Sequence, residues 1–299
     1  MTTPPPLPAD RDPGDNWAVA PDGTRYWGAF GAAGLLAHHA ERGILLQHRA
    51  AWSHHGGTWG IPGGARHHGE AALDAALREA AEEAGVPAGS VHPEAVHVLD
   101  REIWTYTTVV ARVTAAFEPV AADQESLELA WVAVDRVDEL ALHPGFAASW
   151  PVLREALAHR PALVVDAANV VGSVPDGWWR DRAGAATRLM DRLATLAAAG
   201  MPAPDWGLPL HAWYPRIVAV VEGRARGTAA PPGVEVVHAP GEGDDAIVAQ
   251  AHALAAAGHR VTVASSDRGL QRRVADVART RGAGWLLDAL DAAERAQPG

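Results

Sequence analysis

Residues 60–86, GIPGGARHHGEAALDAALREAAEEAGV, constrain this chain more than any other stretch. A glycine-rich segment runs directly into alanine, leucine and glutamate residues whose apolar members repeat at helical spacing. Glu79, Glu82 and Glu83 are separated by three and four positions, so a helix would place all three on one face. Gly85 follows where such a helix is expected to end.

Three like charges on one helix face repel one another unless a cation neutralises them. Carboxylates are the hard oxygen ligands that Mg²⁺ and Mn²⁺ prefer. Gly63 and Gly64 give the preceding loop the backbone freedom to turn a carbonyl toward the same ion. The pattern therefore predicts a divalent-metal site formed by the Gly64 carbonyl with Glu79, Glu82 and Glu83.

This stretch resembles the Nudix box, G-x5-E-x7-R-E-U-x-E-E-x-G-U, where U is apolar. Residues 64–86 match every defined position, and Trp59–Gly64 is similar to the usual lead-in of that family. The resemblance implies an α/β/α sandwich with a mixed sheet and Mg²⁺-dependent hydrolysis of a nucleoside diphosphate linked to another group, X. It also implies that Arg78 holds the carboxylates in place and that Glu70 supports the junction of loop and helix.

Further candidate contacts lie on either side of the box. Arg49 closes a predicted strand and suits a substrate phosphate, although an ordinary surface arginine fits equally well. Trp59 is interpreted either as a base-stacking or as a packing residue, and Gly63 and Gly64 are expected to border the same substrate. The resemblance also implies an extra carboxylate from a later loop, as a metal ligand or as the base that activates water. Glu125 and Glu128 are both candidates for that role, and the sequence does not choose between them.

The chain of 299 residues is long enough for two domains. We expect a disordered Pro-rich tail over 1–24, a Nudix domain over 25–159 and a second α/β domain over 160–299. The chain has no cysteine, no apolar run of membrane-spanning length and no secretory leader, which favours the cytoplasm. All 25 basic residues are arginine, and the net charge of −11 arises before residue 160, so a broad basic surface for polyanions is not expected. The oligomeric state is left open.

Alternating or continuous apolar runs predict the remaining elements of the first domain. Residues 26–50 contain two strands of a hairpin-like pair, and 91–99 and 102–112 are expected to form two more. Two helices are predicted near the end, at 135–140 and 146–159. The histidine pairs 38–39, 54–55 and 67–68 are interpreted as loop and surface residues, because no third ligand follows at helical spacing.

From residue 161 onward, strands alternate with helices, which predicts a mostly parallel sheet. The expected strands are 162–166, 216–221, 234–238 and 261–267, and the expected helices are 181–199 and 247–257. Carboxylates follow three of these strands, and parallel sheets bring such strand ends to one edge. Converging acids of this kind are typical of a two-metal phosphodiester-cleaving site.

This half resembles the PIN-like nucleases of the NYN group over most of residues 161–290. The resemblance rests on D-x2-N after the first strand, an acidic pair opening a helix and S-S-D-R after a later strand. It implies catalytic roles, toward RNA as the partner, for Asp166, Asn169, Asp244, Asp245 and Asp267, with Asp166, Asp245 and Asp267 as metal ligands. Glu222 stands where that family often has aspartate, which puts its ligand role in doubt.

Several readings of this half stay open. The acids could be helix caps of a catalytically silent domain, since a helix N-terminus favours carboxylates by itself. The domain could be an accessory nuclease, it could act with the first domain in processing RNA 5′ ends, or it could only bind RNA or a partner.

Overall fold

The computed structural model describes residues 12–121, 125–175, 177–225 and 227–296. The chain divides into two compact units, one of residues up to 158 together with 209–211, and one of residues 159–208 and 212 onward. The division falls one residue from the predicted boundary at 159/160. Among the described residues, none of the helices is both long and apolar enough to cross a membrane.

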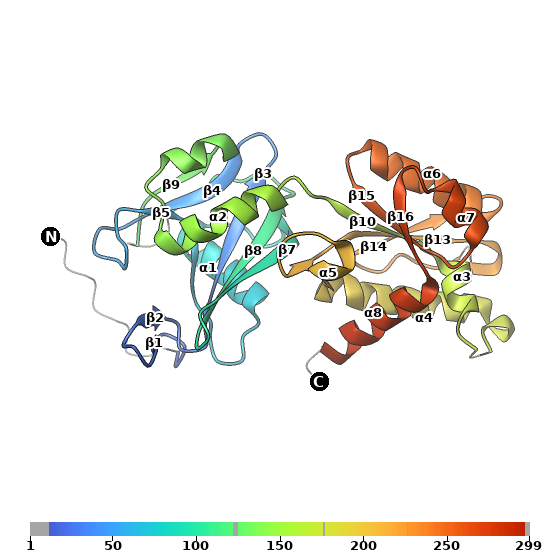
Figure 1. The fold of residues 1–299 in the computed structure, drawn as a ribbon, viewed down its shortest axis with the longest axis horizontal. Coiled ribbons are helices and arrows are strands. Elements are labelled where there is room, and N and C mark those ends of the chain that lie inside the picture. The colour runs from blue at the N-terminus through green and yellow to red at the C-terminus, as the bar shows by residue number, and fades with distance from the viewer. Residues whose placement is uncertain (1–11, 122–124, 176, 226, 297–299) are drawn as a thin grey trace. The chain divides into compact units, whose positions relative to one another are not determined.

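The first unit is built on a mixed sheet in the order β7-β8-β3-β4-β5, with β6 paired to β3 and β9 paired to β4. The neighbours β3 and β8 are parallel, and the other pairs are antiparallel (Figure 1). The elements are β1 Trp17–Val19, β2 Arg25–Trp27, β3 Ala32–His39, β4 Gly43–Arg49, β5 Trp59–Gly60, β6 Gly63–Ala65, α1 Ala72–Ala84, β7 Val91–Asp100, β8 Thr105–Val113, β9 Ser126–Val132, the 3-10 helix η1 Val134–Glu139 and α2 Pro144–Ala156.

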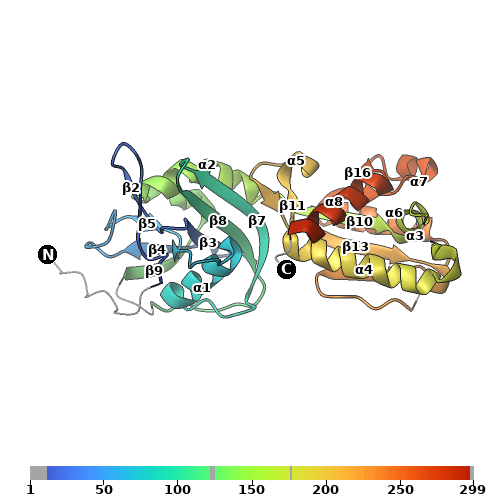
Figure 2. The same cartoon turned by 90° about the horizontal axis from the view of Figure 1, so that it is seen from below.

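Helices α1 and α2 lie on opposite faces of this sheet, as Figure 2 shows. Strand β3 is buried on both faces, which explains its continuous apolar run. Its alternate residues Ala33, Leu35 and Ala37 pack in one cluster with the alanines of α1. Small residues on both elements bring the helix close to the strand that pairs with the glycine segment of β6. The predicted sandwich with a mixed sheet is confirmed.

Helix α1 ends at the predicted glycine. Gly85 adopts φ 62°, in the left-handed region that favours glycine, and its N–H donates to the carbonyl of Ala81. The N–H of Val86 donates to Ala80, so the last turn is closed by two backbone bonds.

The predicted disordered tail is wrong for residues 12–24, because β1 pairs antiparallel with β2. Aromatic contacts explain why these residues adopt a defined structure. Trp17 packs edge-on against Trp27 with ring centroids 5.2 Å apart, and Tyr26 stacks on Trp104 at 5.0 Å. The indole N–H of Trp104 also donates to the carbonyl of Trp27 at 3.0 Å. Residues 1–11 lie outside the described residues.

The second unit contains a five-stranded sheet in the order β14-β13-β10-β15-β16, and every neighbouring pair is parallel. Helices α6 and α7 cover one face, and α3, α4 and α8 cover the other (Figures 1 and 2). The elements are β10 Pro161–Asp166, α3 Ala167–Gly172, the 3-10 helix η2 Trp178–Arg180, α4 Arg182–Ala199, β11 Met201–Pro202, α5 Ala203–Trp206, β12 Ala212–Trp213, β13 Arg216–Val221, the 3-10 helix η3 Gly223–Ala225, β14 Val234–His238, α6 Gly243–Ala256, β15 Arg260–Ala264, α7 Arg268–Arg273, β16 Ala278–Arg281 and α8 Ala283–Ala296.

The predicted parallel sheet is therefore confirmed. Its central strand, β10, is buried along its whole length, and its last residue is Asp166. The fifth strand, β16, escaped prediction because its sequence ARTR is half charged and lies at the sheet edge.

Candidate active site

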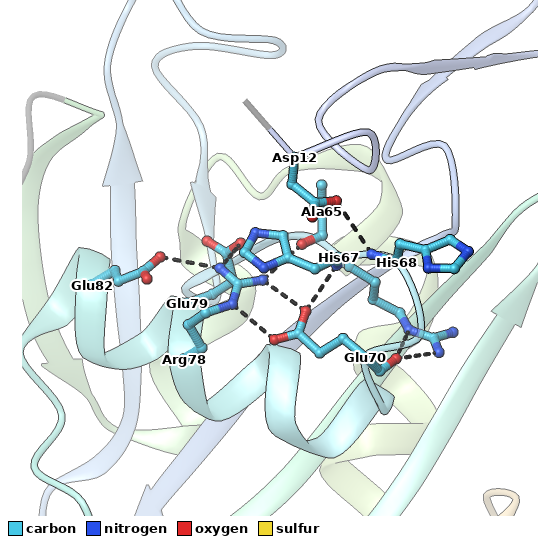
Figure 3. Close-up of polar contacts among 9 residues, drawn as sticks. Asp12, Ala65, His67, His68, Glu70, Arg78, Glu79 and Glu82 are labelled. Atoms are coloured by element: carbon cyan, nitrogen blue, oxygen red, sulfur yellow. Dashed lines mark hydrogen bonds and ion pairs between the residues drawn. The ribbon is translucent and has the colours of Figure 1, made fainter. Parts of the chain in front are cut away.

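One guanidinium joins the glycine loop to helix α1 (Figure 3). Arg78 Nε and Nη2 donate to the two carboxylate oxygens of Glu70 at 2.8 and 3.0 Å. Nη2 also donates to the carbonyl of Ala65 at 2.9 Å. Nη1 donates to Glu79 Oε1 at 2.8 Å and to Glu82 Oε2 at 3.1 Å. Arg78 therefore orients two of the three helix acids while it anchors the loop.

Glu70 occupies the junction between loop and helix. Besides Arg78, its Oε2 accepts a hydrogen bond from the N–H of His67 at 2.8 Å, and its main-chain carbonyl accepts from Arg66 Nη2 at 2.6 Å. The hydrogen bonds from Arg78 are the main cause that holds the pKa of Glu70 at about 2, well below its ordinary value. This is the supporting position that the Nudix resemblance implies for Glu70.

Glu79 lies directly against the glycine loop. A Cβ added at Gly64 would lie 2.6 Å from the carboxyl carbon of Glu79, so only glycine permits this approach. Burial raises the pKa of Glu79 to about 7, against the opposing effect of Arg78. A cation beside this carboxylate would stabilise its charged form.

The other two helix acids differ in exposure. Glu83 is 5% exposed, and its Oε2 accepts a hydrogen bond from the N–H of Gly63 at 2.8 Å. The hydroxyl of partly buried Tyr106 lies 2.7 Å from where a Cβ of Gly63 would be, and desolvation together with the nearby charge of Glu83 raises the pKa of Tyr106. The side chain of Glu82, by contrast, is 59% exposed. Glu82 is therefore the acid that faces solvent.

The donor set fits a hard divalent cation in its chemistry. Carboxylates and a glycine carbonyl are oxygen ligands, and the burial of Glu79 and Glu83 calls for a neutralising charge. The carboxylates are not gathered around one point here, because Arg78 binds Glu79 and Glu82 while Glu83 binds the loop N–H.

The N-terminal turn belongs to the site, which sequence reasoning missed. The charge of Asp15 contributes to raising the pKa of Glu79. Asp12 Oδ1 accepts from the N–H of His68 at 3.2 Å (Figure 3). Both acids precede the Nudix box by about 50 positions, and no periodic pattern in the sequence links them to it.

Arg49 and Trp59 flank a loop between β4 and β5. Arg49 ends β4 and donates through Nε to the carbonyl of His54 at 3.3 Å. The positive charge of Arg49 acts to lower the pKa of both Tyr106 and His143. Burial is the main cause that lowers the pKa of His143 to about 4. Trp59 stacks on His48 at a centroid distance of 4.7 Å and an interplanar angle of 7°. One face of the Trp59 indole is therefore covered by His48. The contacts of Arg49 and Trp59 with a substrate stay predictions.

The two candidate acids after the box lie at different places. Glu128 is exposed on β9 directly opposite His48 of β4, so both side chains leave the same face of the sheet. The carbonyl of Glu125 accepts from the N–H of Ala50 at 2.7 Å, which fixes its backbone at the end of β4.

In the second unit, polar side chains tie together the ends of the adjacent parallel strands β10 and β15. Asp166 Oδ1 accepts from the N–H of Asn169 at 3.0 Å, and its Oδ2 accepts from the hydroxyl of Ser265 at 2.8 Å. Asn169 Oδ1 accepts from the N–H of Ser266 at 2.8 Å. The predicted D-x2-N pair is thus bonded to the predicted S-S segment.

Negative charge is concentrated at this edge. Burial raises the pKa of Asp166, and the charges of Asp244 and Glu222 raise it further. Glu222 Oε2 accepts from the N–H of Gly243 at 2.6 Å, at the start of α6. Glu222, whose role the sequence left in doubt, therefore lies in the same electrostatic environment as Asp166.

Two acids predicted as metal ligands each have a partner within the second unit. The side chain of Asp245 is 74% exposed and pairs with Arg273 of α7 at 2.5 Å. Asp267 Oδ1 accepts from the N–H of Leu270 at 2.8 Å and caps α7. In place of Asp245, its neighbour Asp244 is the member of the acidic pair that acts on Asp166. The sequence does not separate these two, because tertiary packing sets the direction in which each points.

Comparison with known proteins assigns a family to the first half of the chain. Residues 28–156 match the NUDIX domain. A protein of Mycobacterium tuberculosis (strain ATCC 25618 / H37Rv) named "Putative 8-oxo-dGTP diphosphatase 3" is 48% identical over 167 residues, which cover 52% of this chain and 76% of that protein.

Two further proteins show the same likeness. A "Nucleoside triphosphate pyrophosphatase/Nudix hydrolase fusion protein" of Bifidobacterium longum (strain NCC 2705) is 39% identical over 155 residues, 49% of this chain and 32% of that protein. The crystal structure of a Nudix hydrolase from M. smegmatis, RenU, has 46% sequence identity and a TM-score of 0.45, and the match covers 48% of this chain and 96% of that one.

Proposed function

The chain belongs to the Nudix family through its N-terminal half, which is a pyrophosphohydrolase, and from that premise we propose that it is Mg²⁺-dependent and acts on oxidised purine nucleoside triphosphates such as 8-oxo-dGTP. The observation that carries the proposal is the set of oxygen donors on α1 facing the glycine loop, with Arg78 bonded to two of them. The substrate class comes from the name of the M. tuberculosis relative and lies within the nucleoside diphosphate-X compounds expected from the Nudix box.

The residues have distinct roles in this proposal. Glu79, Glu82 and Glu83, with the Gly64 carbonyl, would hold Mg²⁺, which supplies Lewis-acid polarisation of a phosphoryl oxygen and a more acidic water. Arg78 orients the acids and offsets their repulsion. Tyr106 fills the space under the loop and is held protonated by burial.

The remaining groups act on the substrate. In this proposal Arg49 binds a phosphate oxygen, because a guanidinium suits oxyanions. Glu128 or Glu125 is the candidate base that accepts a proton from the attacking water. Glu128 is the stronger candidate, because its side chain leaves the same sheet face as His48, which stacks on Trp59.

Full-length protein incubated with 8-oxo-dGTP or dGTP in Mg²⁺ tests the proposal directly. We expect release of the nucleoside monophosphate and pyrophosphate, with a higher kcat/KM for the oxidised base. Equal kcat/KM values would contradict the substrate class, and a panel of other nucleoside diphosphate derivatives would then identify X. No turnover of any pyrophosphate in the panel would contradict the enzymatic reading itself.

For the second unit we propose a metal-dependent, PIN-like (NYN-type) ribonuclease activity. The observation that favours it is the environment of Asp166. This carboxylate is buried, it accepts a hydrogen bond from Ser265, and the negative charges of Asp244 and Glu222 raise its pKa. A second metal site at this strand edge would neutralise these acids and activate water for attack on a phosphodiester.

Two related functions compete with this one. In the first, the two domains act in sequence, and the Nudix site removes a 5′ triphosphate or cap-like group before the strand is cut. In the second, the PIN-like domain binds RNA without cutting it. Analysis of RNA 5′ ends after incubation with the full-length protein separates these alternatives, because only the first changes the 5′ end.

A further inference from the structure

Three histidines from two distant parts of the first unit come together at the end of β5. Each of His54, His55 and His143 offers one ring nitrogen such that these atoms all lie within 4.8 Å of one another. The ring of His55 is 4.1 Å from that of His54 and 4.8 Å from that of His143, between centroids, and it meets both rings edge-on.

The backbone explains how residues 88 positions apart meet. The N–H of Trp59 donates to the carbonyl of Ala141 at 2.8 Å, and the N–H of His143 donates to the carbonyl of Trp59 at 2.7 Å. Strand β5 thereby fixes the segment before α2 beside the loop that carries His54 and His55.

The loop itself is shaped to present these rings. His55 has φ 55°, in the left-handed region that non-glycine residues seldom adopt. Its carbonyl accepts from the Thr58 hydroxyl at 2.6 Å, and that of His54 accepts from Arg49 Nε at 3.3 Å. An unusual backbone conformation held by such bonds is typical of a functional position.

We propose that His54, His55 and His143 bind one divalent transition-metal ion of the class that prefers imidazole, with Zn²⁺ as the ion to test. Three imidazoles form the protein ligand set of an open zinc site, and they discriminate against Mg²⁺, which prefers the carboxylates of α1. His54 and His55 are exposed, so a fourth position remains accessible to water or to a ligand. An ion here would cross-link the β4–β5 loop to the start of α2.

Binding would change one existing hydrogen bond. His143 Nδ1 accepts from the N–H of Gly145 at 3.1 Å and caps α2. A neutral imidazole that ligates through one nitrogen carries its proton on the other, so His143 cannot ligate a metal and keep this bond. Loss of such a cap lowers the affinity by about tenfold relative to a site without this competition.

Zn²⁺ titration of the full-length protein in excess Mg²⁺ tests the site. We expect one tightly bound Zn²⁺ per chain, at least a hundredfold weaker binding in His54→Gln and in His143→Ala, and no change in His252→Ala. His252 is the matched control because it is a half-exposed histidine on α6 outside the trio. Binding must also persist in Glu82→Gln/Glu83→Gln, which separates this site from the carboxylates of α1.

A spectroscopic measurement guards against indirect effects of the substitutions. Cu²⁺ bound in place of Zn²⁺ should give an electron paramagnetic resonance spectrum with nitrogen hyperfine splitting, which His54→Gln reduces. His143→Ala removes the cap of α2 as well as a ligand, whereas His54→Gln removes only a ligand, so His54→Gln tests the site even if His143→Ala destabilises α2. Absence of Zn²⁺ binding in the parent chain, or undiminished binding in both histidine variants, would overturn the proposal.

Discussion

Arg78 binds Glu70 through two parallel hydrogen bonds, Nε to Oε1 at 2.8 Å and Nη2 to Oε2 at 3.0 Å. This fork geometry leaves Nη1 for the acids Glu79 and Glu82, so a single side chain sets both the position of the loop and the orientation of the helix carboxylates.

Arg78→Lys should therefore impair catalysis although it keeps the charge. An ammonium group is a point donor and cannot bind Glu70 in parallel while it reaches Glu79 and Glu82. We expect kcat to fall by about 10- to 100-fold, since small displacements of positioned groups cost about that much. Steady-state kinetics at saturating Mg²⁺ measures the change. An unchanged kcat would show that the fork is dispensable.

The Glu70–Arg78 pair also predicts a dependence of stability on pH. The folded-state pKa of Glu70, about 2, is lower than the ordinary value of 4.5. Its contribution is therefore complete above about pH 5 and is lost as the pH falls toward 2, with a magnitude of about 1–3 kcal/mol after allowance for solvent screening. In Glu70→Gln the free energy of unfolding, measured by denaturant titration, should fall less steeply between pH 5 and pH 2. Glu155→Gln serves as the control, because Glu155 is an exposed acid on α2 outside this network.

Removal of the helix acids should abolish turnover without unfolding the protein. Glu82→Gln/Glu83→Gln preserves side-chain size but removes two anionic ligands, and we expect kcat/KM to fall by about 10³-fold or more. Circular dichroism and the Mg²⁺ dependence of the residual rate accompany the kinetics. Full activity with Mg²⁺ present would refute the assigned metal site.

Gly64→Ala should disrupt the same site from the loop side. The new Cβ would lie 2.6 Å from the carboxyl carbon of Glu79, closer than real Cβ contacts allow, so either the loop or the acid must move. We expect about a 10²-fold loss of kcat. Gly227→Ala is the control, since a Cβ there meets nothing within 4 Å and the residue lies in the second unit.

Asp166→Asn should abolish RNA cleavage by the second unit while leaving nucleotide hydrolysis intact. The amide keeps the size of the side chain but removes the buried charge near Asp244 and Glu222. Labelled RNA incubated with the full-length protein in the Glu82→Gln/Glu83→Gln background isolates this activity. Cleavage that persists in Asp166→Asn would place the reaction elsewhere, and RNA binding without cleavage in either chain would favour the binding-only alternative.

The local part of this architecture could be predicted from sequence. Helix α1, its end at Gly85 and the shared face of its acids follow from spacing alone, because neighbours along one helix need no tertiary information. The strands of both sheets were found wherever an apolar run was long enough. Strands β5 and β6, of two and three residues, are too short to show alternation.

The nonlocal part could not be predicted. The charge of Asp15 acts on the pKa of Glu79, and His143 lies beside His54 and His55, through turns and β-bridges that no single-sequence period encodes. The interpretation of His54 and His55 as plain loop residues rested on the search for a third ligand at helical spacing, whereas the third imidazole lies far along the chain. The pairing of Arg273 with Asp245 at 2.5 Å and with Asp244 at 3.9 Å is likewise a contact between two helices that no local pattern encodes.

The turn at residues 12–16 has a practical consequence for anyone who trims this protein. The matched domain begins at residue 28, yet Asp12 holds the backbone of His68 and Asp15 acts on Glu79. A shortened chain that starts at residue 28 would retain every residue of the Nudix box and still lack these two acids. Rate constants measured on such a fragment would describe a catalyst with altered charge at its centre.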